Sequence, residues 1–310
     1  MKKHPLARLC AAPALLVLLT ACGSSKTTSS GADGTAGMSH GDTTMMGTSA
    51  TTMSGSAMSP TSADAMAGMD HSGGAMTTMV EPIGDGTAPS AAGYTLHLVT
   101  TPKAVGTSTM TFTVIGADGK AITDAVVEQT KKLHLIVVRK DLSGYQHLHP
   151  TLDSTGLWTV QATFAIGGGW HVITDLTPVE GKRIVLGTDI TITGDSAARP
   201  LPAPSTMATV DGYTVSLLGT LTTKTANLDI GIDKGGKGAT DLTAYLGAGG
   251  HLVAMNATTL AYTHLHPLND PGAMLRFEAA VPTAGRYRLY LQFASGENVH
   301  TAELTVDVTG

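Results

Sequence analysis

A block of sequence recurs 117 residues downstream without a gap, and this repeat limits the possible folds more than any other feature. Of the 32 positions from 119 to 150, 11 are identical in the second copy. A self-match at a fixed offset indicates a duplicated structural unit, so we expect two similar domains. The identical positions include three histidines per copy, at spacings of 13 and 2 residues: His134, His147 and His149, then His251, His264 and His266.

Short apolar runs separated by turn residues begin at Tyr94, and no stretch has the periodicity of an amphipathic helix. The expected strands are 94–100, 110–116, 133–139, 157–166, 170–176 and 183–193, then 213–220, 228–232, 251–255, 274–281, 287–293 and 299–308. Strands at this spacing, in units of about 100 residues, are typical of Greek-key sandwiches. The sequence therefore predicts an all-β protein with two tandem β-sandwich domains, immunoglobulin-like or cupredoxin-like, after a disordered tail.

The first residues have the features of a secretory signal. Lys2, Lys3 and Arg8 are followed by an apolar run over 9–19 that is too short for a membrane span. The run ends in Leu-Thr-Ala-Cys at Cys22, which resembles the bacterial lipobox. We expect residues 1–21 to be a lipoprotein signal peptide and Cys22 to carry acyl chains such as palmitate. The alternatives are ordinary cleavage nearby or an uncleaved anchor.

Two acyl chains on one residue suffice for stable anchoring. The predicted location is therefore the extracytoplasmic face of the plasma membrane, in the cell envelope, where the protein is held by its lipid. The only other cysteine, Cys10, lies within the signal. The folded part then has no thiol, which excludes disulfides, a thiolate nucleophile, cysteine-ligated zinc and a blue-copper centre.

Charge argues against a nucleic-acid partner. The formal net charge is −5, and about −8 once the three basic residues of the signal are removed. Phosphate binding needs clustered lysine and arginine, and the sequence has no such cluster.

Composition divides the rest of the chain. Residues 22–92 are rich in Ser, Thr, Gly, Ala and Met and too poor in other large apolar residues to form a core, which predicts a disordered tether. The predicted domains are 93–195 and 211–310, joined by a proline-rich linker over 196–210.

The tether contains nine of the fourteen methionines, all between Met38 and Met79. Thioether sulfur is a soft ligand for Cu(I), and imidazole also suits copper. The candidate ligands are Met38, His40, Met45, Met46, Met66, Met69 and His71. The alternative is compositional drift in a low-complexity linker, which could carry glycans on Ser and Thr.

The histidine triplets are the second candidate metal site. Residues i and i+2 of a strand share a face, so His147 and His149 point the same way, and Pro150 favours an extended conformation before it. His134 lies in an apolar strand that a short connection joins to this pair. Three imidazoles could then converge on one copper or zinc ion in each copy. The alternative is a structural hydrogen-bonded network.

Two segments resemble a known bacterial envelope family, the YtkA-like and heavy-metal-associated secreted proteins, which are often lipoproteins. The first combines an apolar strand, 133–138, with Asp-Leu-x-x-Tyr-x-His-x-His-Pro at 141–150. The second combines 250–255 with 261–267, followed by the Gly-x-Tyr strand at 285–290. The second copy has Thr258 in place of Asp141. The resemblance implies a metal-handling context, and the tether likewise resembles the tails of copper-handling envelope proteins.

We therefore expect a membrane-anchored extracytoplasmic metal-binding lipoprotein, with copper as the cofactor and metal-handling envelope proteins as partners. The alternative is an envelope adhesion or assembly module with structural histidines. We expect no enzymatic activity, because nucleophile elbows, phosphate-binding glycine loops and zinc-protease helices are missing from the sequence.

Overall fold

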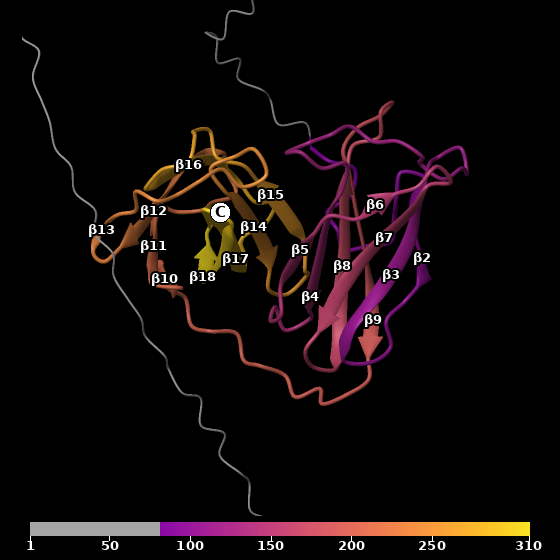
Figure 1. The fold of residues 1–310 in the computed structure, drawn as a ribbon, viewed down its shortest axis with the longest axis horizontal. Helices are drawn as coiled ribbons and strands as arrows, with labels where there is room; N and C mark the ends of the chain where they lie inside the picture. The colour runs from indigo at the N-terminus through magenta and orange to yellow at the C-terminus, as the bar shows by residue number, and fades with distance from the viewer. Residues whose placement is uncertain (1–80) are drawn as a thin grey trace, which may run out of the picture. The chain divides into compact units, whose positions relative to one another are not determined.

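The computed structural model describes residues 81–310, and every regular element within them is a β-strand. The predicted signal peptide, Cys22 and the candidate ligands of the tether lie outside these residues. No helix within 81–310 is long and apolar enough to cross a membrane. The strands form two successive β-sandwiches, so the predicted all-β fold class is confirmed (Figure 1).

The first sandwich consists of two antiparallel sheets with the strand orders β1-β2-β3-β7-β6 and β5-β4-β8-β9. Its strands are β1 (Ser90–Ala91), β2 (Tyr94–Thr100), β3 (Gly106–Ile115), β4 (His134–Arg139), β5 (Gln146–Leu148), β6 (Thr151–Leu152), β7 (Leu157–Phe164), β8 (Gly168–Leu176) and β9 (Ile184–Ile192). Phe112, Trp158 and Trp170 fill the core between the sheets and are almost fully buried.

The second sandwich repeats this arrangement. One sheet has the order β10-β11-β12-β13 with β16 beside β12, and the other has the order β15-β14-β17-β18. Its strands are β10 (Met207–Val210), β11 (Tyr213–Leu218), β12 (Ala226–Lys234), β13 (Lys237–Gly238), β14 (His251–Asn256), β15 (Tyr262–Leu265), β16 (Met274–Ala279), β17 (Gly285–Ser295) and β18 (Asn298–Val308). Tyr213, Phe277 and Phe293 lie in its core. The sheet β5-β4-β8-β9 thus corresponds strand for strand to β15-β14-β17-β18.

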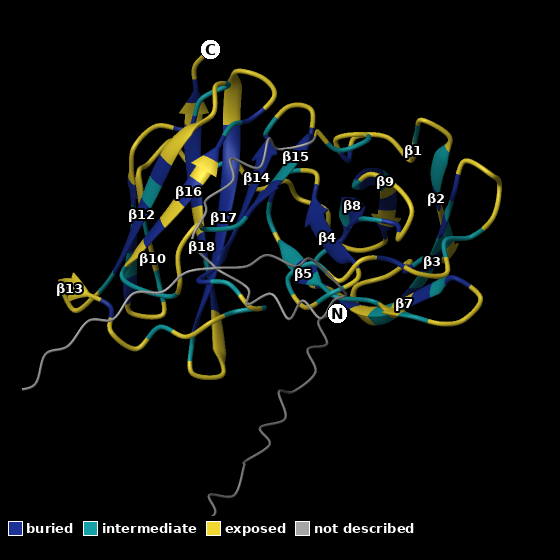
Figure 2. Cartoon of the chain, turned by 90° about the horizontal axis from the view of Figure 1, so that it is seen from above, coloured by how far each residue is buried: buried dark blue, intermediate teal, exposed yellow. Residues whose placement is uncertain are grey.

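Burial distinguishes the strands that lie between the two sandwiches. Strand β16 alternates exposed and buried residues, as expected for a sheet with one solvated face, whereas β4 and β14 are buried at every position (Figure 2). In β4, Leu135 belongs to the core of the first sandwich. Its neighbour Ile136 belongs to a third apolar cluster together with Val253 and Tyr290 of the second sandwich. The two corresponding sheets therefore pack against each other.

The predicted boundary between the tether and the first sandwich, at residue 92, lies too late in the sequence. Residues 81–92 are ordered against the first sandwich, where Ile83 bridges to Ile184 and the Gly187 amide donates to the Ala88 carbonyl. A Cβ atom on Gly187 would lie 1.7 Å from the Gly86 carbonyl oxygen, so only glycine permits this close approach. Backbone pairing decides the position of this segment, and its polar composition gave no indication of it.

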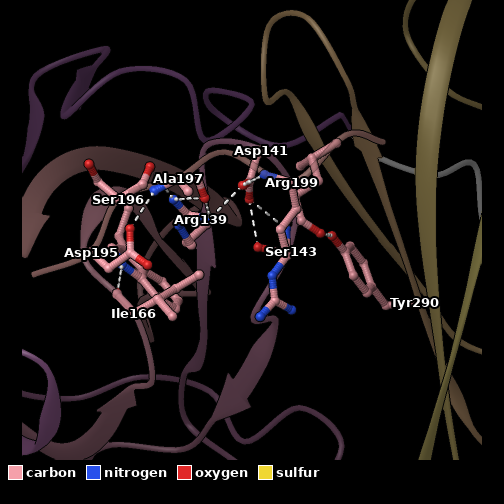
Figure 3. Close-up of polar contacts among 11 residues, drawn as sticks. Arg139, Asp141, Ser143, Ile166, Asp195, Ser196, Ala197, Arg199 and Tyr290 are labelled. Carbon is pink, nitrogen blue, oxygen red and sulfur yellow. Dashed lines mark hydrogen bonds and ion pairs between the residues drawn. The ribbon is translucent and has the colours of Figure 1, made fainter. Parts of the chain in front are cut away.

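The predicted linker over 196–210 is also shorter in the structure, because β10 begins at Met207. The linker's first residues are fixed to the first sandwich (Figure 3). The Arg139 guanidinium donates to the carbonyls of Ser196 and Ala197, and the Arg199 amide donates to the Asp141 carboxylate at 2.8 Å. Asp141 therefore takes part in the hydrogen bonds that hold the start of the linker to the first sandwich.

Candidate metal centre

The six repeated histidines meet where the two sandwiches pack together. His134 begins β4, His147 lies in β5, and His149 follows that strand; His251, His264 and His266 have the same places in β14 and β15. In each triad, one nitrogen of every ring lies within 4.8 Å of the others. The convergence of each triad in space agrees with the spacing argument. All six side chains are buried or half-buried.

A turn before each triad fixes one ring. Residues Glu128 and Lys131 exchange backbone hydrogen bonds around two residues with positive φ, and Tyr245 and Ala248 do the same in the second copy. Strained backbone of this kind often supports a functional site. The turn carbonyls lie 3.2 Å and 3.1 Å from Nε2 of His134 and His251, respectively. Because a carbonyl only accepts, Nε2 carries the proton and Nδ1 of each neutral ring keeps its lone pair.

The opposite sandwich fixes a second ring of each triad. His147 Nδ1 lies 2.8 Å from Oε1 of Gln292, an oxygen that only accepts, so His147 donates through Nδ1. His264 Nδ1 lies 3.6 Å from a carboxylate oxygen of Asp175, a longer electrostatic contact with a group that only accepts. In both rings the lone pair is therefore on Nε2, which points into the triad.

Two bare nitrogens consequently face each other in each triad. His134 Nδ1 lies 2.9 Å from His147 Nε2, and His251 Nδ1 lies 3.1 Å from His264 Nε2. Lone pairs at this distance repel unless a cation lies between them. In addition, Nε2 of His149 and of His266 are buried with no hydrogen-bond partner among the described residues. Each triad thus presents three inward nitrogen atoms to one point.

The lowered pKa values of the histidines argue against a proton as that cation. Burial, and then the neighbouring histidines, lower the pKa of His147, His149 and His251 to about 3, and burial lowers the pKa of His266 to about 4. The pKa values of His134 and His264 are lowered as well, chiefly by burial. Neutral imidazole is the form that binds a metal. At neutral pH, the triads are therefore ready to ligate without losing a proton first.

The donor set suits a transition metal. Metal–nitrogen bonds of about 2.0 Å in a tetrahedral or trigonal site separate two ligand nitrogens by roughly 3.3–3.5 Å. The facing pairs at 2.9 Å and 3.1 Å are slightly closer, and small ring movements would open them. Imidazole ligands suit copper and zinc, and copper binds such sites more tightly in the usual order of affinities.

Asp175 is a charged group in contact with the second triad. It is buried, and Arg183 donates to both of its oxygens while the Tyr262 hydroxyl donates at 2.9 Å. Burial alone would raise the pKa of Asp175, but the Arg183 charge and hydrogen bonds hold it well below its usual range. Asp175 is therefore an anion that orients His264.

These supporting residues are not among the candidates predicted from the sequence. Asp175 and Gln292 lie 117 residues apart, as do Glu128 and Tyr245. The two residues of each pair are of different types, so these positions are not among the identical positions of the repeat. The signal available in the sequence was the repeat offset of 117 residues, which places the two members of each pair at equivalent positions of the two domains.

The unrepeated histidines have other surroundings. His171 Nδ1 lies 2.7 Å from Asp189, and its Nε2 lies 2.7 Å from the Gly86 carbonyl, so this ring holds the N-terminal segment. His300 lies between Asp211 and Ser295. Both rings are fully hydrogen-bonded within the fold, as expected for structural histidines.

The sequence profile of a domain of unknown function, DUF8832, matches residues 89–194 and again residues 208–310. The chain belongs to the DUF8832 family. The two DUF8832 segments coincide with the two sandwiches, so each sandwich with its histidine triad is one copy of the domain. The match leaves the resemblance to YtkA-like and heavy-metal-associated proteins as a prediction. A comparison with curated proteins gave no match.

Solved structures similar to this DUF8832 protein are distant. A tetra-tandem repeat from the extending region of a large adhesion protein is 13% identical, with 69% of this chain and 49% of that chain covered and a TM-score of 0.24. A DUF4785 family protein from Legionella pneumophila is 15% identical, with 64% and 51% covered and a TM-score of 0.25. The chain thus spans about half the length of these two proteins.

Proposed function

We propose that this protein is an extracytoplasmic metal-binding lipoprotein whose two histidine triads bind transition-metal ions, with copper as the first candidate. The observation that carries the proposal is the pair of unprotonated nitrogens that face each other in each triad, with a nitrogen of the third histidine within 4.8 Å of both. Backbone carbonyls, Gln292 and Asp175 take up the outward N–H groups, so the lone pairs converge without an internal partner. A metal ion satisfies all of them together.

The cysteine-free composition and the predicted lipid anchor support an envelope role in metal homeostasis or delivery. A further candidate is the non-metal alternative, an adhesion or assembly module in which the histidines only stabilise the fold. The two roles differ in whether the histidine cluster holds a metal ion, so the metal content of the purified protein distinguishes them. No catalytic role is proposed for the triads.

The decisive experiment is copper loading of the mature protein, followed by desalting and measurement of retained metal by mass spectrometry. The expected result is copper retained in a fixed ratio that falls in the double variant His147→Ala/His149→Ala. His97→Ala is the matched control, because His97 is exposed on β2, and its copper content should equal that of the parent protein. A protein that retains no copper and no zinc would refute metal binding and favour the adhesion role.

The anchor is tested separately. Cys22→Ser, expressed in a bacterium with a lipoprotein pathway, should release the protein from the membrane fraction into the soluble envelope or the medium. Metabolic labelling with a palmitate analogue should mark the parent protein and leave the variant unlabelled. Labelling of both proteins would contradict lipid attachment at Cys22.

A further inference from the structure

The two triads are as close to each other as their own members are. Ring centroids within a triad lie 4.5 Å to 5.3 Å apart, for example 5.1 Å between His134 and His147. Between triads, His134 lies 5.0 Å and His147 lies 5.2 Å from His264. The six rings therefore form one continuous cluster at the contact between the two sandwiches.

We propose that the six histidines form a single binuclear metal centre, built by both sandwiches and holding two transition-metal ions as neighbours. This inference rests on the proposed function, and it adds that the ions interact and that neither half is complete without the other sandwich. The sequence-based prediction of two equivalent, separate sites would then be replaced by one shared centre.

The supporting groups cross between the sandwiches in both directions. Gln292 belongs to β17 of the second sandwich but orients His147 of the first. Asp175 belongs to β8 of the first sandwich but faces His264 of the second. Such outer partners fix the ring orientation and the basicity of a metal-binding histidine. Each triad therefore depends on the opposite sandwich for its geometry.

One cavity borders histidines of both triads. It has a volume of about 240 Å³ and reaches His134 of the first triad together with His264 and His266 of the second. Its lining also includes the acidic residues Glu128, Asp175 and Glu278 and one basic residue, Arg183. Three acidic residues against one basic residue give the lining a net negative charge, which attracts cations towards the histidines that the cavity reaches.

The two halves should differ in affinity. A carboxylate supports His264, whereas a neutral amide supports His147, and a negative partner raises the basicity of the ligating ring. Arg183 neutralises part of the Asp175 charge, which reduces the difference without removing it. We therefore expect the triad with His264 to fill first and the triad with His147 second.

The test uses Cu(II) alone as the probe on the intact mature protein, with electron paramagnetic resonance at increasing copper-to-protein ratios. One equivalent should give the signal of an isolated Cu(II) ion. A second equivalent should broaden that signal and produce a half-field transition, which arises only from two coupled spins. Two bound ions whose spectrum is twice that of one would overturn the binuclear centre and leave metal binding intact. A maximum of one ion would also overturn it, and no bound ion would refute the proposed function itself.

A variant series tests the crossed support by direct affinity. His264→Ala/His266→Ala should bind one ion and lose the half-field transition. Addition of Gln292→Leu to this variant should weaken the remaining site by about 10- to 100-fold, as loss of an outer partner usually does. Gln161→Leu on the exposed face of β7 is the matched control. Equal affinity with and without Gln292 would overturn the crossed arrangement, and circular dichroism would verify that each variant is folded.

Discussion

Asp175 in the first sandwich and Gln292 in the second occupy equivalent positions 117 residues apart, and each faces a histidine of the opposite sandwich. Within its own sheet, Asp175 is paired with His134 and Gln292 with His251. Each of the two residues thus lies beside one triad and supports the other. This exchange couples the geometry of the six histidines to the packing of the two sandwiches.

Replacement of Asp175 should destabilise the protein. Asp175→Asn removes the carboxylate that pairs with Arg183 and leaves the guanidinium without its counter-charge. Breaking a fully buried pair costs about 3–5 kcal/mol, and because the Arg183 side chain is 29% exposed we expect a smaller loss, about 2–3 kcal/mol. Urea denaturation of the metal-free protein measures this loss. The control Asp307→Asn breaks the exposed pair with Arg286 and should cost less than about 1 kcal/mol. Equal losses in both variants would contradict a stabilising role for the buried pair.

The metal-free protein should lose stability in mild acid. Burial lowers the pKa of His147, His149 and His251 to about 3, whereas the unfolded chain protonates histidine near pH 6.5. Between these pH values the unfolded state binds more protons, so stability is complete above pH 6.5 and falls as the pH decreases towards 3. Each such histidine contributes a slope of up to about 1.4 kcal/mol per pH unit.

Urea midpoints at pH 7, 6 and 5 in the presence of a chelator measure this slope. The variant His149→Gln should have a shallower slope than the parent protein, whereas His97→Ala should match the parent. A parent midpoint that does not change over this range would be inconsistent with neutral, buried imidazoles.

The contact between Tyr290 and the first sandwich should contribute to the packing of the two domains. The Tyr290 hydroxyl donates to the Leu142 carbonyl at 2.6 Å, and its ring stacks on Tyr145 at a centroid distance of 4.0 Å. Tyr290→Phe removes only the hydrogen bond and should cost about 1 kcal/mol, whereas Tyr290→Ala also removes the ring and should cost about 3–5 kcal/mol. Thermal unfolding compares both with Tyr94→Phe, a half-buried position expected to be nearly neutral. An Ala variant no less stable than the Phe variant would show that the stacked ring contributes nothing.

The tether should bind Cu(I) independently of the sandwiches. A peptide of residues 36–80, which includes Met38, His40 and Met69, should compete with a chromogenic chelator for Cu(I). Affinity per site should be modest, because binding must order the backbone of an isolated peptide. A matched peptide with every methionine replaced by norleucine keeps the apolar volume and removes the sulfur, so it should compete much less. Equal competition by both peptides would assign binding to His40 and His71 alone, and no competition at micromolar metal would favour the linker interpretation.

The sequence by itself determined the duplication, the β-sandwich class and the convergence of each histidine triad. The reason is that these features depend on local rules: strand periodicity, turn residues and the shared face of His147 and His149. Identical spacing in the second copy then extends the same geometry to His264 and His266. All twelve expected strands overlap observed strands, and the observed strands that were not expected include the short β1, β6, β10 and β13, where pairing partners decide whether a strand forms.

Only the tertiary structure decided that the two triads meet. That outcome depends on what covers the outer faces of β4 and β14, which are both buried along their whole length. The sequence of a strand buried on both faces is apolar throughout, whether its outer face contacts another domain or another element of its own domain. The roles of Asp175 and Gln292 were hidden for the same reason, because their partners lie in the opposite sandwich and no local pattern connects them. The sequence specifies the chemistry of each side chain, but the packing of one surface on another determines which side chains share a site.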